Sequence, residues 1–182
     1  MSTTTNTPAL TESLTRHSGL PSCVVQGLGH DWRLCGRGIY VWTVFRCYWA
    51  SLYTHTGAFD EKSPAILDLS YLRTISKEQT VTISVDEMLR LHPELREHAH
   101  RWREELSRII PDVKLGDRLV GYFDPAYGAS FFSDQQALGE VADPEFAGAF
   151  LSIWLHPATR ANALREALLG GAQVAHTAEV AS

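Results

Sequence analysis

The stretch IYVWTVFRCYWASLYT, residues 39–54, is the strongest strand signal in the chain. It is dense in β-branched and aromatic side chains and contains neither Pro nor Gly. Both of its alternating faces are mainly apolar, which is typical of a strand, or a bent pair of strands, that is covered on both sides. Gly36 and Gly38 stand at its start. Because a strand follows them and not a helix, we interpret them as turn or bulge glycines and not as a nucleotide-binding loop.

The rest of the chain separates into blocks of strands and blocks of helices. Strand-like alternation predicts four shorter strands, at residues 65–73, 118–123, 129–132 and 137–141. Helical spacing and capping residues predict four helices: at residues 76–91, opened by a capping box of Ser76 and Gln79, from Pro93 to Pro111, from Pro144 behind the N-cap Asp143, and from near Thr159 to Gly170. Such separate blocks predict an α+β fold in which an antiparallel sheet packs against a helical layer.

The length and composition fit one domain. The chain has 182 residues, of which 45% are hydrophobic and 20% are charged, as is ordinary for a globular protein that builds a core. Residues 1–22 are rich in Ser and Thr, and residues 171–182 are rich in Ala and small polar side chains, so both ends are predicted to be flexible. A single domain is predicted between them, at residues 23–170.

The charge pattern argues against a nucleic-acid partner. Sixteen Lys and Arg residues against 21 Asp and Glu residues give a net charge of −5, and basic residues do not cluster among aromatic ones. No stretch approaches the roughly 18 uninterrupted apolar residues of a transmembrane helix. Residues 1–20 also contain no apolar segment of the kind that secretion signals carry. We therefore expect a cytoplasmic protein without a membrane span.

The cysteines and histidines give no signal for a metal or a cofactor. Cys23, Cys35 and Cys47 are odd in number, widely spaced and outside any C-x-x-C pattern, so we interpret them as small core residues on strands. His98 and His100 are two residues apart on a predicted helix and point in different directions, so they cannot share one metal ion. No cofactor is predicted.

Arg46 is the candidate functional residue that the strand pattern singles out. On a regular strand it shares a face with Tyr40, Trp42 and Tyr48, where a charge is costly unless it is paired. Two interpretations stay open. Arg46 pairs with a residue such as Asp68 or lies at an exposed strand end. Alternatively, its guanidinium group and a phenol hold the anion of a ligand in an apolar pocket.

Arg73 repeats this pattern on the next predicted strand. Leu67, Leu69, Tyr71 and Arg73 share one strand face, so Arg73 is also a charge beside a phenol on an apolar surface. Arg73 and Tyr71 are therefore further candidates for a ligand site.

Four stretches resemble the bacterial chalcone isomerase-like domain. They are LCGRGIYVWTVFRCYWASLYT at 34–54, PAILDLSYLRTIS at 64–76, IIPDVKLGDRL at 109–119 and LGEVADPEFAGAFLSIWLHPATRANALREALLG at 138–170. With the spacing between them, the resemblance covers residues 23–170. It implies an open-faced β-sandwich, in which an antiparallel sheet is backed by helices with a cleft between the two layers. Plant enzymes of this superfamily close a chalcone to a flavanone, and other relatives hold a fatty acid in the same cleft.

The resemblance also carries site positions onto this chain. The enzymes use an arginine, which stabilises the substrate phenolate, and a threonine on the early strands. These two positions fall at Tyr40 and near Tyr48, and a later Ser or Thr of the cleft corresponds to Thr159. Because Tyr40 supplies no fixed cation, the resemblance argues against chalcone cyclisation. Our hypothesis is that Arg46 takes the place of the missing arginine.

Three hypotheses follow for the function. In the first, a cleft lined by Trp42, Tyr48 and Trp154 binds a fatty acid or a similar amphiphilic carboxylate, and Arg46 or Arg73 holds the carboxylate. In the second, the chain is an isomerase or intramolecular lyase that acts on a phenolic or enone substrate by positioning and anion stabilisation. In the third, it is a structural domain with a filled core. We favour the first, and the sequence names no protein partner.

Overall fold

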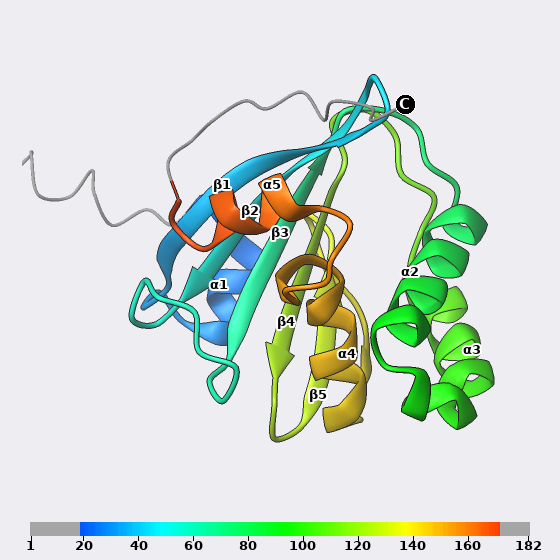
Figure 1. The fold of residues 1–182 in the computed structure, drawn as a ribbon. Helices are drawn as coiled ribbons and strands as arrows, with labels where there is room; N and C mark the ends of the chain where they lie inside the picture. The colour runs from blue at the N-terminus through cyan, green and yellow to red at the C-terminus, as the bar shows by residue number, and fades with distance from the viewer. Residues whose placement is uncertain (1–18, 172–182) are drawn as a thin grey trace, which may run out of the picture.

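Six antiparallel strands form one sheet in the computed structural model, which describes residues 19–171 (Figure 1). Every strand pairs with its neighbours in the sequence, so the sheet is a simple meander from β1 to β6. The strands are β1 Arg33–Trp42, β2 Phe45–Thr54, β3 Ala65–Tyr71, β4 Arg118–Asp124, β5 Gly128–Phe132 and β6 Ala137–Val141. The α+β fold with an antiparallel sheet is therefore confirmed.

The helices lie on both faces of the sheet, with most of them on one face. They are α1 Ser22–Leu28, α2 Lys77–Leu91, the 3-10 helix η2 Pro93–His98, α3 Ala99–Ile109, α4 Pro144–Leu155 and α5 Asn162–Leu168. Figure 1 shows α4 and α5 over the sheet, α2 and α3 beyond α4, and α1 behind the sheet. The capping box of Ser76 and Gln79 and the N-cap Asp143 form as the sequence predicts.

The stretch at residues 39–54 folds as a hairpin of two strands, the bent pair among the two alternatives that its sequence allows. Strand β1 ends at Trp42 and β2 begins at Phe45. Thr43, in the turn between them, has a positive φ of 57°. Such a left-handed residue suits a tight two-residue connection between twisted strands. We define Trp42–Phe45 as the hairpin tip.

A β-bulge at Cys47 then changes which side chains share a face. Tyr40 pairs with Tyr48, whereas Val41 pairs with Arg46, so β2 has one residue more than β1 over this interval. Because successive residues of a strand point to opposite faces, Val41 and its partner Arg46 lie on the face opposite Tyr40. The expectation that Arg46 shares a face with Tyr40 and Tyr48 is therefore wrong.

The main core lies between the sheet and the helical layer. Its large aromatic members come from both layers and are Trp102, Phe123, Phe131, Phe146, Phe150 and Trp154. The rings of Phe123 and Phe150 stack across the two layers with their centroids 5.7 Å apart. This arrangement fixes α4 over strands β4 and β5, and burial of these aromatic rings is the main source of stability for the pair of layers.

A smaller core lies under α1 on the other face of the sheet. Its buried members are Leu20, Val24, Trp32, Tyr53, Ile66 and Val120. Leu20, which the sequence assigns to the flexible arm, is thus packed against the sheet. Cys23 lies on α1 and not on a strand, so our interpretation of that cysteine as a strand residue is wrong. Residues 1–18 of the predicted arm and residues 172–182 of the predicted tail lie outside the described residues.

Helix α5 lies against β1 because two glycines leave room for it. A Cβ atom at Gly36 would lie 2.0 Å from the carbonyl oxygen of Ala167, and one at Gly38 would lie 2.8 Å from side-chain atoms of Leu164 and Ala167. A register shift does occur between Leu34 and Gly36. This shift fits the bulge inferred from sequence, and the close approach of the helix adds a second demand for glycine that the sequence does not show.

Gly36→Ala is expected to destabilise the protein because the added methyl group collides with the backbone of α5. We expect a loss of about 1–3 kcal/mol in the free energy of unfolding, as for other overpacked sites. Gly148→Ala is the matched control, because Gly148 is exposed within α4 and nothing lies within 4 Å of an added Cβ. That change is expected to stabilise the helix by roughly 0.5–1 kcal/mol. Urea denaturation followed by circular dichroism measures both, and a neutral Gly36→Ala would contradict the contact.

Candidate functional site

Three tyrosines form a row across neighbouring strands on the face that carries the helical layer. Tyr40 of β1 is the cross-strand partner of Tyr48 of β2, which in turn is the partner of Tyr71 of β3. The rings of Tyr40 and Tyr48 stack with centroids 5.0 Å apart, and those of Tyr48 and Tyr71 meet edge to face at 5.6 Å. We call this set the tyrosine row. Tyr71 is buried, whereas Tyr40 and Tyr48 are half-buried, so the row reaches the surface.

One hydrogen bond connects Tyr48, the central residue of the tyrosine row, to the helical layer. The indole Nε1 of Trp154, on α4, donates to the hydroxyl oxygen of Tyr48 at 3.0 Å. Trp154 is itself fixed in the aromatic core by Phe150, whose ring centroid lies 5.5 Å away. The sequence groups Tyr48 with Trp154 as lining residues, and the structure brings them into contact.

The environment keeps the phenols of the row protonated. Burial raises the pKa of Tyr48 well above 10.0, although the hydrogen bond from Trp154 acts in the opposite direction. Burial likewise raises the pKa of Tyr71, with a further contribution from Cys47, and raises the pKa of Tyr40. These groups can therefore donate hydrogen bonds and stack against apolar or aromatic surfaces. They are unsuited to serve as a general base near neutral pH.

Arg90 and Arg160, two arginines that share the carboxylate of Glu87, lie beside the tyrosine row. The Glu87 carboxylate, on α2, accepts from Nε and Nη2 of Arg90 at 3.0 and 2.9 Å and also pairs with Arg160. Arg90 also donates to the carbonyl oxygen of Ala158, which ties α2 to the connection between α4 and α5. Glu87 raises and Arg160 lowers the pKa of Tyr40, so both charges act on the row.

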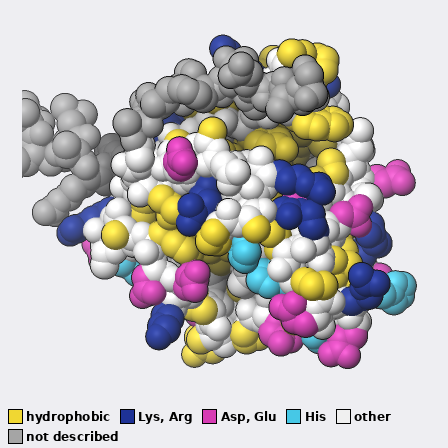
Figure 2. Space-filling model, viewed as in Figure 1, with side chains coloured by type: hydrophobic (Ala, Val, Ile, Leu, Met, Phe, Trp, Pro, Cys, Tyr) yellow, Lys and Arg dark blue, Asp and Glu magenta, His cyan; other side chains and the backbone are white. Residues whose placement is uncertain are grey.

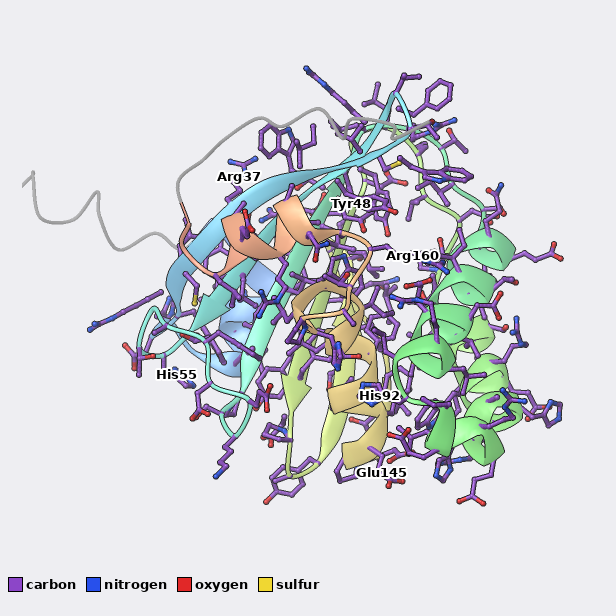
Figure 3. All side chains as sticks on the ribbon, in the orientation of Figure 1. Arg37, Tyr48, His55, His92, Glu145 and Arg160 are labelled. Carbon is purple, nitrogen blue, oxygen red and sulfur yellow. The ribbon has the colours of Figure 1, made fainter. Side chains whose placement is uncertain are left out.

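Arg160 lies near enough to the tyrosine row for its charge to act on Tyr40. Figure 3 labels Tyr48 on β2 and Arg160 in the connection between α4 and α5, and Figure 2 shows basic side chains close together on this view of the molecule. Two guanidinium charges against one carboxylate leave a net charge of +1 at this place. Sequence patterns missed these residues because Arg90 lies on a helix face that alternates charges in the ordinary way and Arg160 lies in a connection.

The structure places the other predicted site residues away from the tyrosine row. Arg46 is exposed on the opposite face of the hairpin, and Trp42 is 62% exposed at the hairpin tip. Arg73 is exposed after the end of β3, with its guanidinium carbon 4.8 Å from the centroid of the Phe45 ring. Neither arginine therefore supplies a cation to the space between the sheet and the helices, as the isomerase hypothesis requires. Their ligand-binding role stays a prediction.

Two further sequence suggestions receive structural explanations. Thr159 is buried, donates to the carbonyl oxygen of Ile153 at 2.6 Å and accepts from the backbone N–H of Ala161, so both of its hydrogen bonds shape the α4–α5 connection. Asp68, the partner suggested for Arg46, instead forms an ion pair with Arg118 on the face away from the helical layer.

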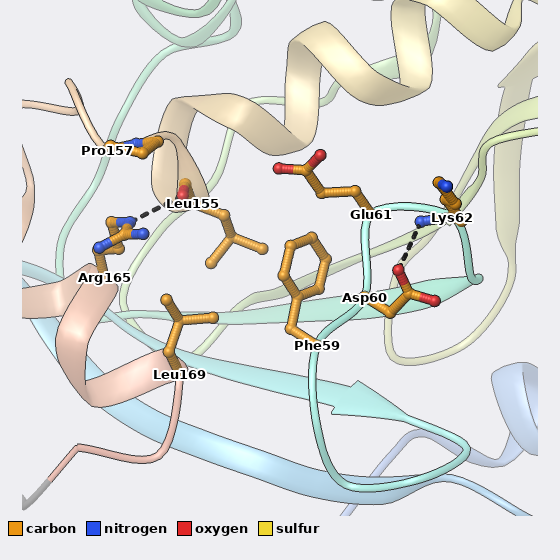
Figure 4. Close-up of a pocket in the computed structure, with 8 residues that line it drawn as sticks. All are labelled: Phe59, Asp60, Glu61, Lys62, Leu155, Pro157, Arg165 and Leu169. Carbon is orange, nitrogen blue, oxygen red and sulfur yellow. Dashed lines mark hydrogen bonds between the residues drawn. The ribbon is translucent and has the colours of Figure 1, made fainter.

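A surface hollow of about 330 Å³ lies on the other side of α5. Figure 4 shows Phe59, Leu155 and Leu169 facing one another across it, with Lys62 and Arg165 at its rim. The Nε of Arg165 donates to the carbonyl oxygen of Leu155 at 2.8 Å, which leaves the other guanidinium nitrogens toward the rim. The volume lies at the lower end of small-molecule sites. Asp60 and Glu61 also line the hollow and balance the charges of Lys62 and Arg165.

A serine–histidine contact links α2 and α4. The Nε2 of His92 lies 3.0 Å from Oγ of Ser152, and its Nδ1 lies 3.4 Å from the carboxylate of Glu94. The Ser152 hydroxyl, however, donates to the carbonyl oxygen of Ala149 in its own helix at 2.6 Å, so its proton is not offered to His92. The contact therefore joins two helices and does not activate a nucleophile.

The described residues contain neither a metal-binding cluster nor a membrane-spanning helix. Among residues 19–171, no three His, Cys, Asp or Glu side chains come close enough together to hold a metal ion. None of the helices described here is both long enough and apolar enough to cross a bilayer.

The meander sheet, the helical layer and the aromatic row between them define an open-faced α+β sandwich. The chain belongs to the chalcone isomerase-like family, because the sequence model of that family matches residues 19–170. This match confirms the resemblance seen in the sequence.

The chain is also similar to two further proteins. An uncharacterized protein of Haemophilus influenzae is 27% identical over 150 residues, which cover 81% of this chain and 72% of the relative. The crystal structure of a fatty-acid binding protein of Arabidopsis thaliana matches with a TM-score of 0.61, covering 79% of this chain and 89% of that chain at 11% identity. At this low identity the structural match shows a shared fold.

Tyr48→Phe is expected to destabilise the protein because it leaves the indole N–H of Trp154 without its acceptor. The loss expected for an unsatisfied, largely buried donor is about 1–3 kcal/mol in the free energy of unfolding. Tyr127→Phe removes the same atom from a side chain that is 77% exposed and serves as the control, with little expected change. Urea denaturation measures both. Two equal losses would show that the hydrogen bond between Trp154 and Tyr48 contributes nothing specific.

Stability is also expected to fall at alkaline pH. Tyr48 and Tyr71 have pKa values raised above 10.0 in the folded chain, so the unfolded chain releases these protons first. The stabilisation from the buried phenols is therefore complete below about pH 10 and is lost as the pH rises through the folded pKa values. Denaturation at about pH 8 and about pH 11 measures the loss, and Tyr71→Phe is expected to reduce it. An unchanged pH dependence in Tyr71→Phe would refute this assignment.

Proposed function

We propose that this protein binds a fatty acid or a similar amphiphilic carboxylate against the tyrosine row. The observation that carries the proposal is the combination of protonated phenols with two guanidinium groups that share a single carboxylate. An apolar wall with a few convergent polar groups is the usual composition of a small-molecule site. The fold that this chain shares with a fatty-acid binding protein supports the same class of ligand.

The ligand carboxylate is expected to pair with Arg160 and with the hydroxyl of Tyr40. The Arg160 side chain is 73% exposed, so a ligand reaches it without opening the core. The Tyr40 phenol makes no hydrogen bond to a residue in the described part of the chain, and its proton is available for donation. A guanidinium group and a phenol together give charge-assisted hydrogen bonds, which are the strong kind.

The acyl chain is expected to lie along the aromatic rings. Tyr40 and Tyr48 present half-buried ring surface next to Trp154, and the stack of the first two rings offers an apolar surface. Burial of each methylene group against such a surface contributes about 0.8 kcal/mol, so longer acyl chains bind more tightly until the surface is covered. Glu87 competes with the ligand for Arg160, so its removal is expected to strengthen binding.

An isomerase activity has less support from the same residues. Anion stabilisation of a phenolic substrate needs a cation that faces the reacting centre. Arg46 and Arg73 are exposed outside the row, Arg160 is already paired with the Glu87 carboxylate, and the phenols themselves stay protonated. A binding function needs only the contacts described above.

Titration of the purified protein with saturated fatty acids of increasing length, followed by calorimetry, tests this proposal. Arg160→Ala is expected to weaken binding roughly tenfold or more, the value of a charge-assisted hydrogen bond. Glu87→Gln is expected to tighten it. Arg108→Ala, a change of the same kind on the exposed end of α3, is the control and is expected to have no effect. The methyl ester of the same acid is expected to bind more weakly than the acid.

Two results would overturn parts of the proposal in different ways. If Arg165→Ala or Lys62→Ala weakens binding while Arg160→Ala does not, the ligand occupies the surface hollow beside α5 and the assigned site is wrong. If no acid binds, and denaturing extraction followed by mass spectrometry releases no small carboxylate from the purified protein, the binding function itself is refuted. That outcome favours a structural domain.

A further inference from the structure

The hairpin tip exposes three large apolar side chains at one end of the sheet. Trp42, Val44 and Phe45 are 62%, 81% and 53% exposed, although they follow one another almost directly in the sequence. Figure 1 shows the tip projecting at the upper end of the molecule, and Figure 2 shows hydrophobic side chains on that edge. A contiguous apolar surface of this kind marks a contact with a partner or a membrane more often than it marks chance exposure.

The outer face of the same hairpin carries arginines between apolar residues. The pairs Ile39–Trp49 and Val41–Arg46 lie on the face opposite the tyrosine row, because the bulge at Cys47 places Arg46 there. Arg37 shares this face, and its guanidinium carbon lies 4.9 Å from the centroid of the Trp49 ring. The outer face is thus a surface of aromatic and basic side chains that leads to the hairpin tip.

Arg73 adds a further cation at the hairpin tip, beside Phe45 and not on the outer face, because Phe45 pairs with Trp42 and Trp42 shares the face of Tyr40. Its guanidinium carbon lies 4.8 Å from the centroid of the Phe45 ring, and the backbone N–H of Leu72 donates to the carbonyl oxygen of Cys47. The segment after β3 is therefore held beside the start of β2. Arg73 and Arg46 are both exposed and make no ion pair with another described residue.

The charge of the hairpin is opposite to that of the whole chain. Residues 32–59 contain three arginines and neither Asp nor Glu, although the chain as a whole carries a net charge of −5. Two acidic residues of the loop before β4 are engaged nearby: Asp112 accepts from the backbone N–H of Lys77, and Asp117 accepts from that of Lys114. Both carboxylates are thus taken up by backbone N–H groups of their own loop region. The hairpin itself contributes arginines and no acidic residue at this end.

We propose that the β1–β2 hairpin docks on the surface of a bilayer that contains anionic lipids. Trp42, Val44 and Phe45 enter the interfacial layer, where aromatic side chains are favoured. The guanidinium groups of Arg46 and Arg73 pair with lipid phosphates, a geometry that suits the planar guanidinium fork. The proposal does not depend on the ligand proposed for the tyrosine row, because it uses the opposite face and the tip of the hairpin.

A second copy of the chain is the alternative occupant of this surface, and the charges argue against it. Strand β1 is an edge strand, so its outer backbone groups offer a site for strand pairing. Two hairpins that pair through β1 would bring Arg33 and Arg37 of each copy together without an acidic residue between them. Phosphate groups of a bilayer neutralise those charges, whereas a second hairpin adds to them.

Flotation with lipid vesicles tests the proposal on the full-length protein. We expect binding to vesicles that mix phosphatidylcholine with phosphatidylglycerol, weaker binding to pure phosphatidylcholine, and a loss of binding at high salt. Trp42→Ser with Phe45→Ser is expected to weaken binding roughly tenfold or more, because the apolar insertion is lost. Tyr127→Ser, which changes another exposed aromatic residue in the turn between β4 and β5, is the matched control.

Two double charge-reversal variants test whether vesicle binding depends on the position of the arginines or only on the net charge of the protein. Arg46→Glu with Arg73→Glu is expected to weaken vesicle binding roughly tenfold or more. Arg96→Glu with Arg108→Glu, which makes the same change of net charge on η2 and α3, is expected to have little effect. Circular dichroism checks that each variant folds, which is expected because the substituted side chains are exposed.

Three outcomes would refute membrane docking. The first is an absence of binding to the anionic vesicles at low salt. The second is an equal loss of binding in the hairpin variants and in their controls. The third is a dimer in light scattering that the Trp42→Ser/Phe45→Ser variant converts to a monomer, since that result would assign the hairpin tip to a second copy of the chain.

Discussion

One extra residue in β2 determines the chemistry of both faces of the β1–β2 hairpin. The bulge at Cys47 lets Tyr40 face Tyr48 on the helix side while Val41 faces Arg46 on the outer side. Without the bulge, a regular register would bring the guanidinium of Arg46 onto the face that the helices cover, where an unpaired charge is costly. The bulge therefore keeps a buried aromatic row and an exposed basic surface on the same two strands.

The tyrosine row depends in turn on how the helices are held over the sheet. Asp143 caps α4, and its carboxylate also accepts from Nε1 of Trp102 and pairs with Arg101 on α3. These hydrogen bonds hold the pKa of Asp143 below its usual value, although burial alone would raise it. The start of α4 is thereby fixed to α3, and three turns later Trp154 meets Tyr48. The hydrogen bond from Trp154 to Tyr48 is therefore made by a helix whose start is held to α3.

The two proposed functions share a physical basis, which is recognition of an anionic head with an apolar tail. On the inner side, Arg160 and the phenol of Tyr40 are proposed to bind a single carboxylate beside aromatic rings. At the hairpin, Arg46 on the outer face and Arg73 beside Phe45 flank an apolar tip that is proposed to meet many lipid phosphates. The difference lies in the apolar part: the rings of the tyrosine row are partly buried under the helical layer, whereas the side chains of the hairpin tip are exposed.

The sequence by itself determined the α+β class, the capping of α2 and α4 and most strand positions, because these follow from local periodicity and from caps within a few residues. It also identified Tyr40, Tyr48 and Tyr71 as candidates on aromatic strands, and Trp154 on a predicted helix. Only the tertiary structure decided that Arg46 lies on the outer face, because a bulge reverses the side-chain alternation without changing composition. Only it placed Arg160 beside Glu87 and Gly36 under α5, because both contacts join segments that are far apart in the chain.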